Sequence, residues 1–273
     1  MSKARSRFEL AAARRHGWDV DPATEQAHRQ DGDLGFVHSW EVGSTMDGPG
    51  IRFVLFLTGC LLRCQYCHNP DSWHLRNGRP RTIEAICGEI DKYARALKVA
   101  GGGITISGGE PMVQLPFMRR ILAHCRTRGL HTALDTAGRL GERMADEDIG
   151  LVDLQILDIK SGDPETYERV TSQPLQPTLD YARRLSALGR PIWVRFVLVP
   201  GLTDDAGNVD RLAEFVAGLD TVDRVEVLRF HQMGAHKWDA LGLPYALPDT
   251  PPPDAALTER VRDQFRSRGL TVY

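Results

Sequence analysis

Residues 52–70 read RFVLFLTGCLLRCQYCHNP, a short apolar run followed at once by three cysteines. The cysteines, Cys60, Cys64 and Cys67, have the spacing C-x₃-C-x₂-C. Thiolates are the usual ligands of iron–sulfur clusters, and three of them leave one iron of a [4Fe–4S] cube open. The spacing alone also allows a zinc site with His68 as a further ligand, or a disulfide beside a spare thiol.

The composition predicts one sizeable globular domain. The chain has 273 residues, of which 42% are hydrophobic and 26% charged. A formal net charge of −2 gives no general attraction to nucleic acid. No apolar run approaches the roughly 18 to 20 residues of a membrane span, so no membrane role is expected. An odd number of cysteines, five, favours a reducing compartment, and we expect a cytoplasmic location. Cys87 and Cys125 fall in helix-like segments and are expected to be packing residues.

Residues 1–32 differ from the rest of the chain. They are polar, and the first fifteen carry five basic side chains against one acidic. We expect a flexible N-terminal extension here, although an Arg-rich start is also typical of an organellar transit peptide. Residues 33–273 form the predicted folded domain.

Short β-branched runs alternate with helix-like segments from residue 35 onward, which is typical of a parallel sheet with crossover helices. Six units are fewer than the eight of a closed (β/α)₈ barrel, so we predict an α/β fold with an open, partial (β/α)₆ barrel. The predicted core strands are 52–57, 103–107, 131–134, 151–159, 191–199 and 224–230, flanked by strands at 35–40 and 269–273. The predicted helices are 82–97, 115–128, 139–149, 178–188, 205–219 and 254–268.

Polar and glycine-rich motifs follow each predicted core strand at its carboxyl end. The carboxyl ends of parallel strands share one rim, where ligands bind. The motifs are therefore expected to line one cavity. They are the cysteine loop, SGGEP at 107–111, Asp135-Thr136, Asp158-Ile159-Lys160, VPG at 199–201, and His231.

Each motif suits a ligand at this rim, although each also has a simpler explanation. Gly108 and Gly109 let backbone N–H groups approach a ligand, or merely make a turn. Asp158 and Lys160 lie two apart, point to the same side of the strand, and either grip a zwitterion or form a partly exposed ion pair. His231 either contacts a nucleoside or is a core histidine with satisfied hydrogen bonds.

Several runs carry a family resemblance. They are EVGSTMDGPGIRFVLFLTGCLLRCQYCHNPDSW at 41–73, GGGITISGGEPM at 101–112, HTALDTAG at 131–138, LQILDIK at 154–160, WVRFVLVPGLTDD at 193–205 and FHQMGAHKW at 230–238. In these runs the chain resembles radical S-adenosylmethionine enzymes, and within them the pyruvate formate-lyase activating enzymes. GPGIR before the cysteines and HKW near the end point to this glycyl-radical activating branch.

The resemblance implies a site and its ligands. Cys60, Cys64 and Cys67 would hold a [4Fe–4S] cluster whose open iron is chelated by S-adenosylmethionine. Asp135, Thr136 and Asp158, with a carbonyl near Ile156, would bind a monovalent cation such as Na⁺ or K⁺. The residues implied in binding S-adenosylmethionine are Tyr66, Cys67, His68, Gly109, Asp158, Ile159, Lys160 and His231.

The resemblance also implies an activity. A reductant, flavodoxin or ferredoxin, would supply one electron for cleavage of S-adenosylmethionine, and a 5′-deoxyadenosyl radical would abstract hydrogen from a glycine of pyruvate formate-lyase. No protein acid or base is needed, since the cofactor carries the radical chemistry. A monomer is expected. The alternatives are a radical enzyme acting on another glycyl radical enzyme or on a small molecule, and a metal-binding module without activity.

Two features bear on the partner. Leu228-Arg229-Phe230-His231 stands where the family usually has Leu-Pro-Tyr-His, and Arg229 is expected to alter how a partner loop docks. No cysteine-rich insert follows Asn69, and this favours pyruvate formate-lyase over the other glycyl radical enzymes.

Overall fold

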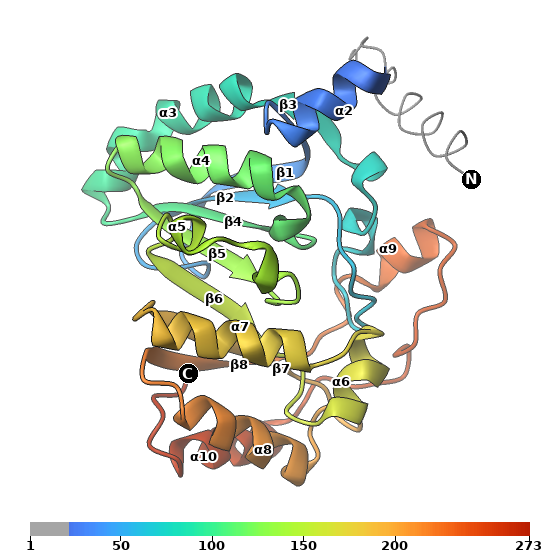
Figure 1. Cartoon of the computed structure of the whole chain (residues 1–273). Helices are drawn as coiled ribbons and strands as arrows, with labels where there is room; N and C mark the ends of the chain where they lie inside the picture. The colour runs from blue at the N-terminus through green and yellow to red at the C-terminus, as the bar shows by residue number, and fades with distance from the viewer. Residues whose placement is uncertain (1–21) are drawn as a thin grey trace. The chain divides into compact units, whose positions relative to one another are not determined.

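The computed structural model describes residues 22–273. Its eight strands form an open sheet in the order β3-β1-β2-β4-β5-β6-β7-β8 (Figure 1), which confirms the predicted α/β class and open partial barrel. The strands are β1 Leu34–Ser44, β2 Arg52–Leu57, β3 Arg79–Thr82, β4 Gly103–Gly108, β5 His131–Thr136, β6 Leu154–Asp158, β7 Ile192–Leu198 and β8 Val222–Arg229.

Helices connect most of these strands. None of those described from residue 22 onward has both the length and the apolar character needed to cross a bilayer. The helices are α2 Pro22–Gln30, α3 Ile83–Val99, α4 Leu115–Thr127, α5 Asp146–Ile149, α6 Pro164–Thr171, α7 Gln176–Ala187, α8 Ala206–Ala217, α9 Ala235–Ala240 and α10 Ala255–Arg266. Short 3₁₀ turns lie at Pro70–Ser72, Leu75–Asn77, Pro111–Gln114 and Gly141–Arg143.

The chain divides into two compact units. Among the described residues, the first comprises 22–60, 72–135 and 144–153, and the second comprises 61–71, 136–143 and 154–273. Cys60 ends a segment of the first unit, whereas Cys64 and Cys67 belong to the second.

In the first unit, β3, β1 and β2 pair antiparallel, whereas β2 pairs parallel with β4 and β4 with β5. Strand β2 is buried along nearly its whole length, as expected for a strand covered on both faces. Helices α3 and α4 contact one another, and α3 also contacts β2 and β4 (Figure 1). Cys87 and Cys125 are buried on these helices, as predicted for packing residues.

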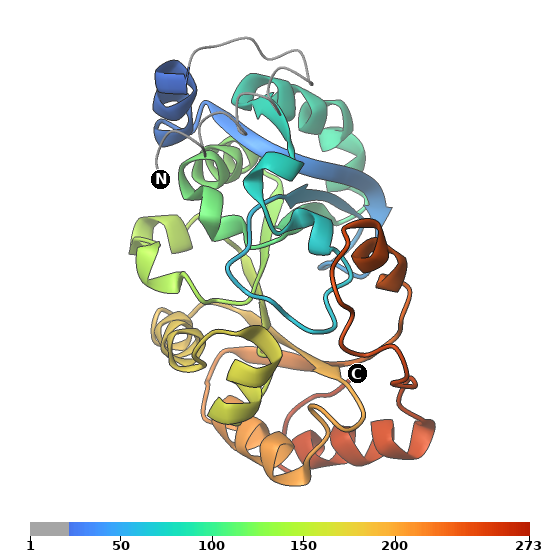
Figure 2. The same ribbon diagram turned by 90° about the vertical axis from the view of Figure 1, so that its right-hand side faces the viewer.

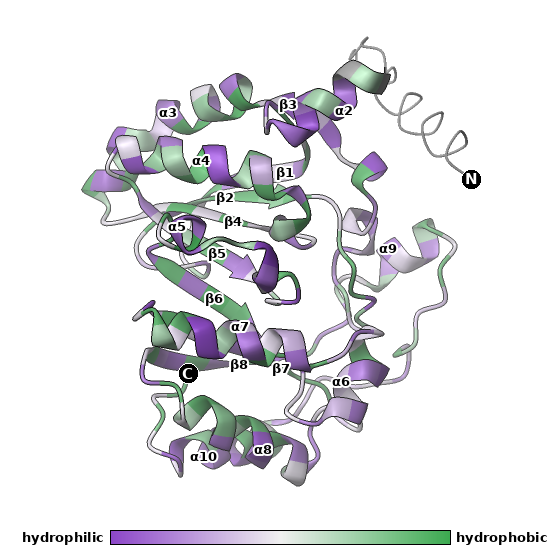
Figure 3. Ribbon diagram, viewed as in Figure 1, coloured by the Kyte–Doolittle hydropathy of each residue, from purple (hydrophilic) through white to green (hydrophobic). Residues whose placement is uncertain are grey.

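In the second unit, β6, β7 and β8 pair parallel. Helix α10 packs on α8 and on β8, as the 90° view in Figure 2 also shows. Strand β6 (LQILD) is buried except at Asp158, whereas α7 and α8 alternate apolar and polar residues along their length (Figure 3). This is the pattern of helices that bury one face against a sheet and expose the other.

All six predicted core strands are present, but two other predictions differ from the structure. The predicted helix at 139–149 is only a 3₁₀ turn and the four-residue α5. Gly141 explains part of this, because a Cβ there would lie 2.2 Å from the Tyr181 ring, so the segment runs too close to α7 for a regular helix. The predicted strand at 269–273 is a single bridge from Val272 to Val225.

One strand and three helices were not predicted. The sequence pattern did not predict strand β3, because the strand contains Pro80. Proline is tolerated in this edge strand but not in a central one. Helices α6 and α9 are short and lie in segments treated as loops. Helix α2 falls within the predicted extension, and its Glu25 is buried. Residues 1–21 lie outside the described residues, so their predicted flexibility stays a prediction.

A buried arginine holds the amino ends of β2 and β4 together. Arg52 is fully buried, and its guanidinium donates to Thr105 Oγ1 at 3.0 Å, to the Pro49 carbonyl at 3.3 Å and to the Ile104 carbonyl. Desolvation lowers the pKa of Arg52 to about 10, which leaves it charged at neutral pH. The charge is tolerated because carbonyl and hydroxyl oxygens surround it.

Replacing Arg52 with Met should therefore destabilise the protein strongly. The variant keeps apolar volume but leaves several buried carbonyls without a donor, and removing one side of a buried charged network costs about 3 kcal/mol. Urea unfolding measures the change. Lys92→Ala is the control, because the Lys92–Glu89 pair is largely exposed on the lysine side. Equal unfolding midpoints for the two variants would contradict the role assigned to Arg52.

Candidate functional site

Cys60 leaves β2 in the first unit, where the backbone is held on two sides. Its N–H donates to the Trp73 carbonyl at 3.0 Å, and the Gly59 N–H donates to the Ser72 carbonyl at 2.7 Å. Gly59 in turn accepts from the Glu110 N–H at 2.7 Å. The start of the cysteine loop is thus tied to the SGGE segment that follows β4.

Gly109 shows why this segment needs glycine. A Cβ there would lie 2.5 Å from the Gly59 carbonyl oxygen and 3.1 Å from that of Ser72. The neighbouring Gly108 has φ of 116°, a conformation that L-residues with side chains rarely adopt. The structure therefore explains both glycines by close backbone packing beside Cys60, and the predicted contact of Gly109 with S-adenosylmethionine stays a prediction.

Cys64 and Cys67 lie in the second unit. The Cys67 N–H donates to the Cys64 carbonyl at 3.0 Å, which closes a tight turn around the two thiols. Cys64 is buried and Cys67 half-buried, and none of the five cysteines, which all lie within the described residues, forms a disulfide. Desolvation raises the pKa of the Cys64 thiol to about 12. A metal ion reverses this preference, because it deprotonates a thiol that coordinates it.

Three thiols match the usual protein ligands of an iron–sulfur cluster. Within residues 22–273, no group of three or more His, Cys, Asp or Glu side chains converges as the ligands of one metal ion do. The cysteines of a cluster each bind a different iron, so they need not meet at a point. The predicted fourth zinc ligand, His68, is engaged elsewhere.

His68 packs against His231. Their ring centroids lie 4.2 Å apart with 31° between the planes, and His68 Nε2 donates to the His231 carbonyl at 3.2 Å. Burial lowers the pKa of His68, and the nearby His231 lowers it further. Gly234 permits this contact, since a Cβ there would lie 2.6 Å from His68 Cα. Two predicted site residues are thus brought together by the turn before α9.

Helix α9 holds the same part of the loop. Trp238 Nε1 donates to the Cys67 carbonyl at 2.9 Å. Lys237 Nζ lies 2.8 Å from Asn69 Oδ1 and 3.2 Å from Asp71 Oδ2. The sequence interpretation had noted HKW only as a family motif and assigned neither residue a role. The structure shows that both residues support the backbone that carries Cys67 and His68.

Asp158 and Lys160 form an ion pair at the end of β6, as their spacing predicted. Their side chains are only 18% and 13% exposed, so this is not the weakly interacting surface pair of the simpler explanation. Burial lowers the pKa of Lys160, but Asp158 more than offsets this and the pKa lies well above its usual value. Lys160 Nζ also lies 5.6 Å from the centre of the Tyr66 ring.

Two buried polar atoms beside this pair have no protein partner. They are Asp158 Oδ1 and the Tyr66 hydroxyl. Buried polar atoms in folded proteins are nearly always hydrogen-bonded, so these two indicate a place for a polar ligand. Such a ligand would need a donor for the carboxylate, which the amine and ribose hydroxyls of S-adenosylmethionine supply. The residues of the second unit therefore fit this cofactor.

The remaining predicted residues are engaged in other contacts. Ile159 is fully buried and its N–H donates to the Arg195 carbonyl at 3.0 Å, so its predicted contact with the cofactor stays a prediction. Asp135 Oδ2 accepts from Ser107 at 2.7 Å, and Thr136 Oγ1 accepts from the Gly138 N–H at 2.9 Å. The monovalent cation stays a prediction.

Arg229, the departure from the family pattern, is bound within the chain. Its Nε and one terminal nitrogen donate to the Pro253 carbonyl at 3.2 and 2.6 Å. Gln232 reaches the same Pro-rich loop, with Nε2 at 3.0 Å from the Leu247 carbonyl. Arg229 thus anchors the 247–253 loop, and an effect on partner docking stays a prediction.

Comparisons with known proteins identify the family of this chain. The Radical SAM superfamily model matches residues 54–213. The pyruvate formate-lyase-activating enzymes of Staphylococcus epidermidis and Staphylococcus aureus are 42% and 43% identical over 239 residues, which cover 85% of this chain and 94% of each relative.

Solved structures share the fold. A domain of a pyruvate-formate lyase-activating enzyme from Bacteroides vulgatus matches with a TM-score of 0.52 at 24% identity, covering 63% of this chain and 98% of that one. A radical SAM methyltransferase from Sphaerobacter thermophilus matches with a TM-score of 0.58 at 17% identity, covering 100% and 88%.

The fold and the matched residues define a radical S-adenosylmethionine enzyme, a class that uses a [4Fe–4S] cluster and S-adenosylmethionine, as predicted. Within this class, the identity to the staphylococcal proteins over nearly their whole length is decisive. The chain belongs to the family of pyruvate formate-lyase-activating enzymes.

Replacing Trp238 with Phe should loosen the third cysteine. The ring is kept but the donor to the Cys67 carbonyl is lost, and one such hydrogen bond is worth about 1 kcal/mol. We expect the variant to lose its reconstituted iron to a chelator about fivefold faster than the wild type. Absorbance measures the rate of this loss. Trp40→Phe on β1 is the control, since Trp40 lies in the first unit, on a strand remote from α9 in the sequence. Equal rates for both variants would rule out this support.

The raised pKa of Cys64 predicts slow alkylation of the iron-free protein. With a pKa of about 12, only about one Cys64 thiol in 10⁴ is ionised at pH 8, and the thiolate is the reactive form. Iodoacetamide labelling read by mass spectrometry should show Cys64 protected when folded and rapidly modified in urea, where its pKa returns to its ordinary value. Fast labelling of the folded protein at pH 8 would contradict this environment.

Proposed function

We propose that this protein activates pyruvate formate-lyase by generating a glycyl radical on it, using S-adenosylmethionine and a [4Fe–4S] cluster. The observation that carries the proposal is the 42–43% identity to enzymes of that name over 94% of their length, with the cysteine loop and the Asp158–Lys160 pair present in this chain. When bound and reduced, the cluster supplies the electron that splits the sulfonium bond and yields a 5′-deoxyadenosyl radical.

The thiols of Cys60, Cys64 and Cys67 are the proposed cluster ligands. Their role is supported by the C-x₃-C-x₂-C spacing, and by the backbone contacts that hold each end of the loop in its own unit. Cys87 and Cys125, buried on α3 and α4, are excluded as ligands in this proposal. The chain therefore offers three thiolates and leaves one iron for S-adenosylmethionine.

Asp158, Lys160 and Tyr66 are the proposed contacts of the amino-acid and ribose portions. Asp158 Oδ1 is buried and accepts from no protein group, so it can take a donor from the cofactor. Lys160 stays charged next to Asp158 and can face a carboxylate. Gly109 and Ile159 would contribute backbone groups, and the stacked His68 and His231 would contact the nucleoside. Orientation of the bound cofactor is the protein's contribution to selectivity.

The partners follow from this activity. The proposed protein substrate is pyruvate formate-lyase, and the proposed electron donor is a flavodoxin or a ferredoxin. A monomer suits a protein whose substrate is a loop of another large enzyme. Asp135, Thr136 and Asp158 remain the proposed ligands of a monovalent cation, and the cytoplasm remains the proposed location.

Anaerobic reconstitution tests the function. Protein loaded with iron and sulfide is mixed with dithionite, S-adenosylmethionine and pyruvate formate-lyase. We expect 5′-deoxyadenosine by chromatography and a glycyl radical signal by electron paramagnetic resonance. Cys64→Ala should abolish both, whereas Cys125→Ala should retain them, because Cys125 only fills the core between α3 and α4.

The outcomes separate the alternatives. Deoxyadenosine without a glycyl radical on pyruvate formate-lyase would indicate a radical enzyme with another substrate. Absence of deoxyadenosine from well-reconstituted protein would indicate a metal-binding module. Equal activity of Cys64→Ala and Cys125→Ala would disprove the ligand assignment.

A further inference from the structure

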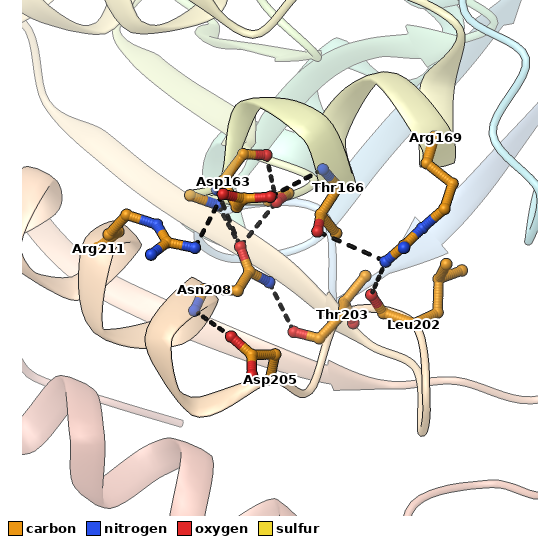
Figure 4. A network of polar contacts seen from close by, with 10 residues as sticks. Asp163, Thr166, Arg169, Leu202, Thr203, Asp205, Asn208 and Arg211 are labelled. Carbon is orange, nitrogen blue, oxygen red and sulfur yellow. Dashed lines mark hydrogen bonds and ion pairs between the residues drawn. The ribbon is translucent and has the colours of Figure 1, made fainter.

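A buried asparagine on α8 organises the loops that follow β6 and β7. Asn208 is 1% exposed. Three donors converge on its Oδ1: the Ser161 hydroxyl at 2.7 Å, the Gly162 N–H at 2.8 Å and the Asp163 N–H at 2.9 Å. Figure 4 shows its Nδ2 donating to the Thr203 carbonyl, at 2.7 Å. The side chain amide thus has every polar atom satisfied, which also fixes its orientation.

The segment that Asn208 holds begins directly after Lys160. Residues 161–163 connect the Asp158–Lys160 pair to α6, and they lie directly on the α8 backbone. A Cβ on Gly162 would lie 2.4 Å from the Leu212 nitrogen and 2.6 Å from the Asn208 carbonyl oxygen. The path of the chain after Lys160 is therefore set by α8 rather than by solvent.

The same anchor extends through α6. Asp163 caps this helix by accepting from the Thr166 N–H at 2.9 Å, and Arg211 on α8 pairs with Asp163 at 2.8 Å (Figure 4). Arg169, near the other end of α6, donates to the Leu202 carbonyl at 3.4 Å. Helix α6 is thus fixed at its start to α8 and near its end to the loop that precedes α8.

The last turn of α6 carries the cysteine loop. The Arg63 N–H donates to the Thr171 carbonyl at 2.7 Å, and the Gln65 N–H donates to the Val170 carbonyl at 3.0 Å. These two residues flank Cys64. The carbonyls in the last turn of a helix have no hydrogen-bond partner within the helix, and here N–H groups of the cysteine loop donate to two of them. A continuous chain of bonded groups thus runs from Asn208 through α6 to the backbone of Cys64.

We infer that Asn208 is a positioning residue for cofactor binding, which holds the Asp158–Lys160 strand end and, through α6, the backbone around Cys64. It touches neither cluster nor substrate. An asparagine suits the position because it combines an acceptor for three donors with a donor for the Thr203 carbonyl. The inference rests on the proposed function, since it concerns the geometry in which S-adenosylmethionine is held.

Removing the amide should weaken cofactor binding. In Asn208→Ala, the Gly162 N–H loses its acceptor, while the Ser161 hydroxyl and the Asp163 N–H keep only the bonds they make within the 161–163 segment, so this segment is no longer tied to α8 through the amide. We expect the dissociation constant of the reconstituted protein for S-adenosylmethionine, measured by equilibrium dialysis, to rise about tenfold. Asn208→Asp keeps the acceptor and loses the donor to Thr203, so its dissociation constant should lie between those of the wild type and Asn208→Ala.

A second readout uses the full chain without iron. Amide hydrogen exchange should accelerate in peptides covering residues 61–67 and 158–171 of Asn208→Ala. Gly162→Ala should produce the same two effects by pushing the loop off α8, so it replaces Asn208→Ala if that variant does not fold. Val216→Ala is the matched control, because Val216 is fully buried on the same helix and removing two methyl groups destabilises the core without touching the loop.

The controls determine how each result is interpreted. Binding by Val216→Ala within twofold of the wild type, with tenfold weaker binding by Asn208→Ala, supports positioning over general destabilisation. Unimpaired binding by folded Asn208→Ala, or equal weakening in Val216→Ala, overturns the inference while leaving the proposed function intact. A wild type that assembles its cluster but binds no S-adenosylmethionine overturns the proposed function, and the inference with it.

Discussion

An irregular loop carries the cysteines, and its backbone must find hydrogen bonds in other elements. Regular helices and strands satisfy their own backbone groups, but a loop that is partly buried cannot do so. Here the N–H groups flanking Cys64 bond to the end of α6, and the Cys67 carbonyl accepts from Trp238. The position of the thiols therefore depends on short helices formed by sequence that lies 100 to 170 residues further along the chain.

The buried charges at the end of β6 are governed by the same need. An isolated ammonium or carboxylate would be costly to bury, and the pairing of Lys160 with Asp158 offsets that cost. The pairing leaves one carboxylate oxygen unsatisfied, beside the unsatisfied Tyr66 hydroxyl. A protein selected only for stability would gain by replacing such atoms with apolar groups. Their retention is explained when a polar cofactor completes the set.

The sequence was a good guide wherever the local pattern and the tertiary environment demanded the same structure. The six core strands were predicted because buried parallel strands read as short apolar runs, as in 52–57 and 192–198. The helix at 139–149 failed because Gly141 lies against Tyr181, a contact that no local pattern reveals. Strand β3 was missed because Pro80 normally argues against a strand, and only its edge position permits it.

The candidate site shows the same division between what was predicted and what was missed. Residues with their own chemistry, such as the cysteines and the Asp158–Lys160 pair, could be proposed from motif and spacing. The residues that hold these side chains in place could not be proposed from the sequence, because their role depends on partners far away in the chain. Nothing in the run AGNVDRLAEF marks Asn208 as different from an ordinary polar residue in the first turn of a helix.

Only the fold brings Asn208 beside a loop that lies 45 residues or more before it in the chain. Supporting residues of this kind are defined by the groups they bond, and Asn208 combines an acceptor for the Ser161–Asp163 segment with a donor to the Thr203 carbonyl. A fixed motif is therefore the wrong signal for such residues. The informative signal is a buried side chain that bonds the backbone next to a ligand.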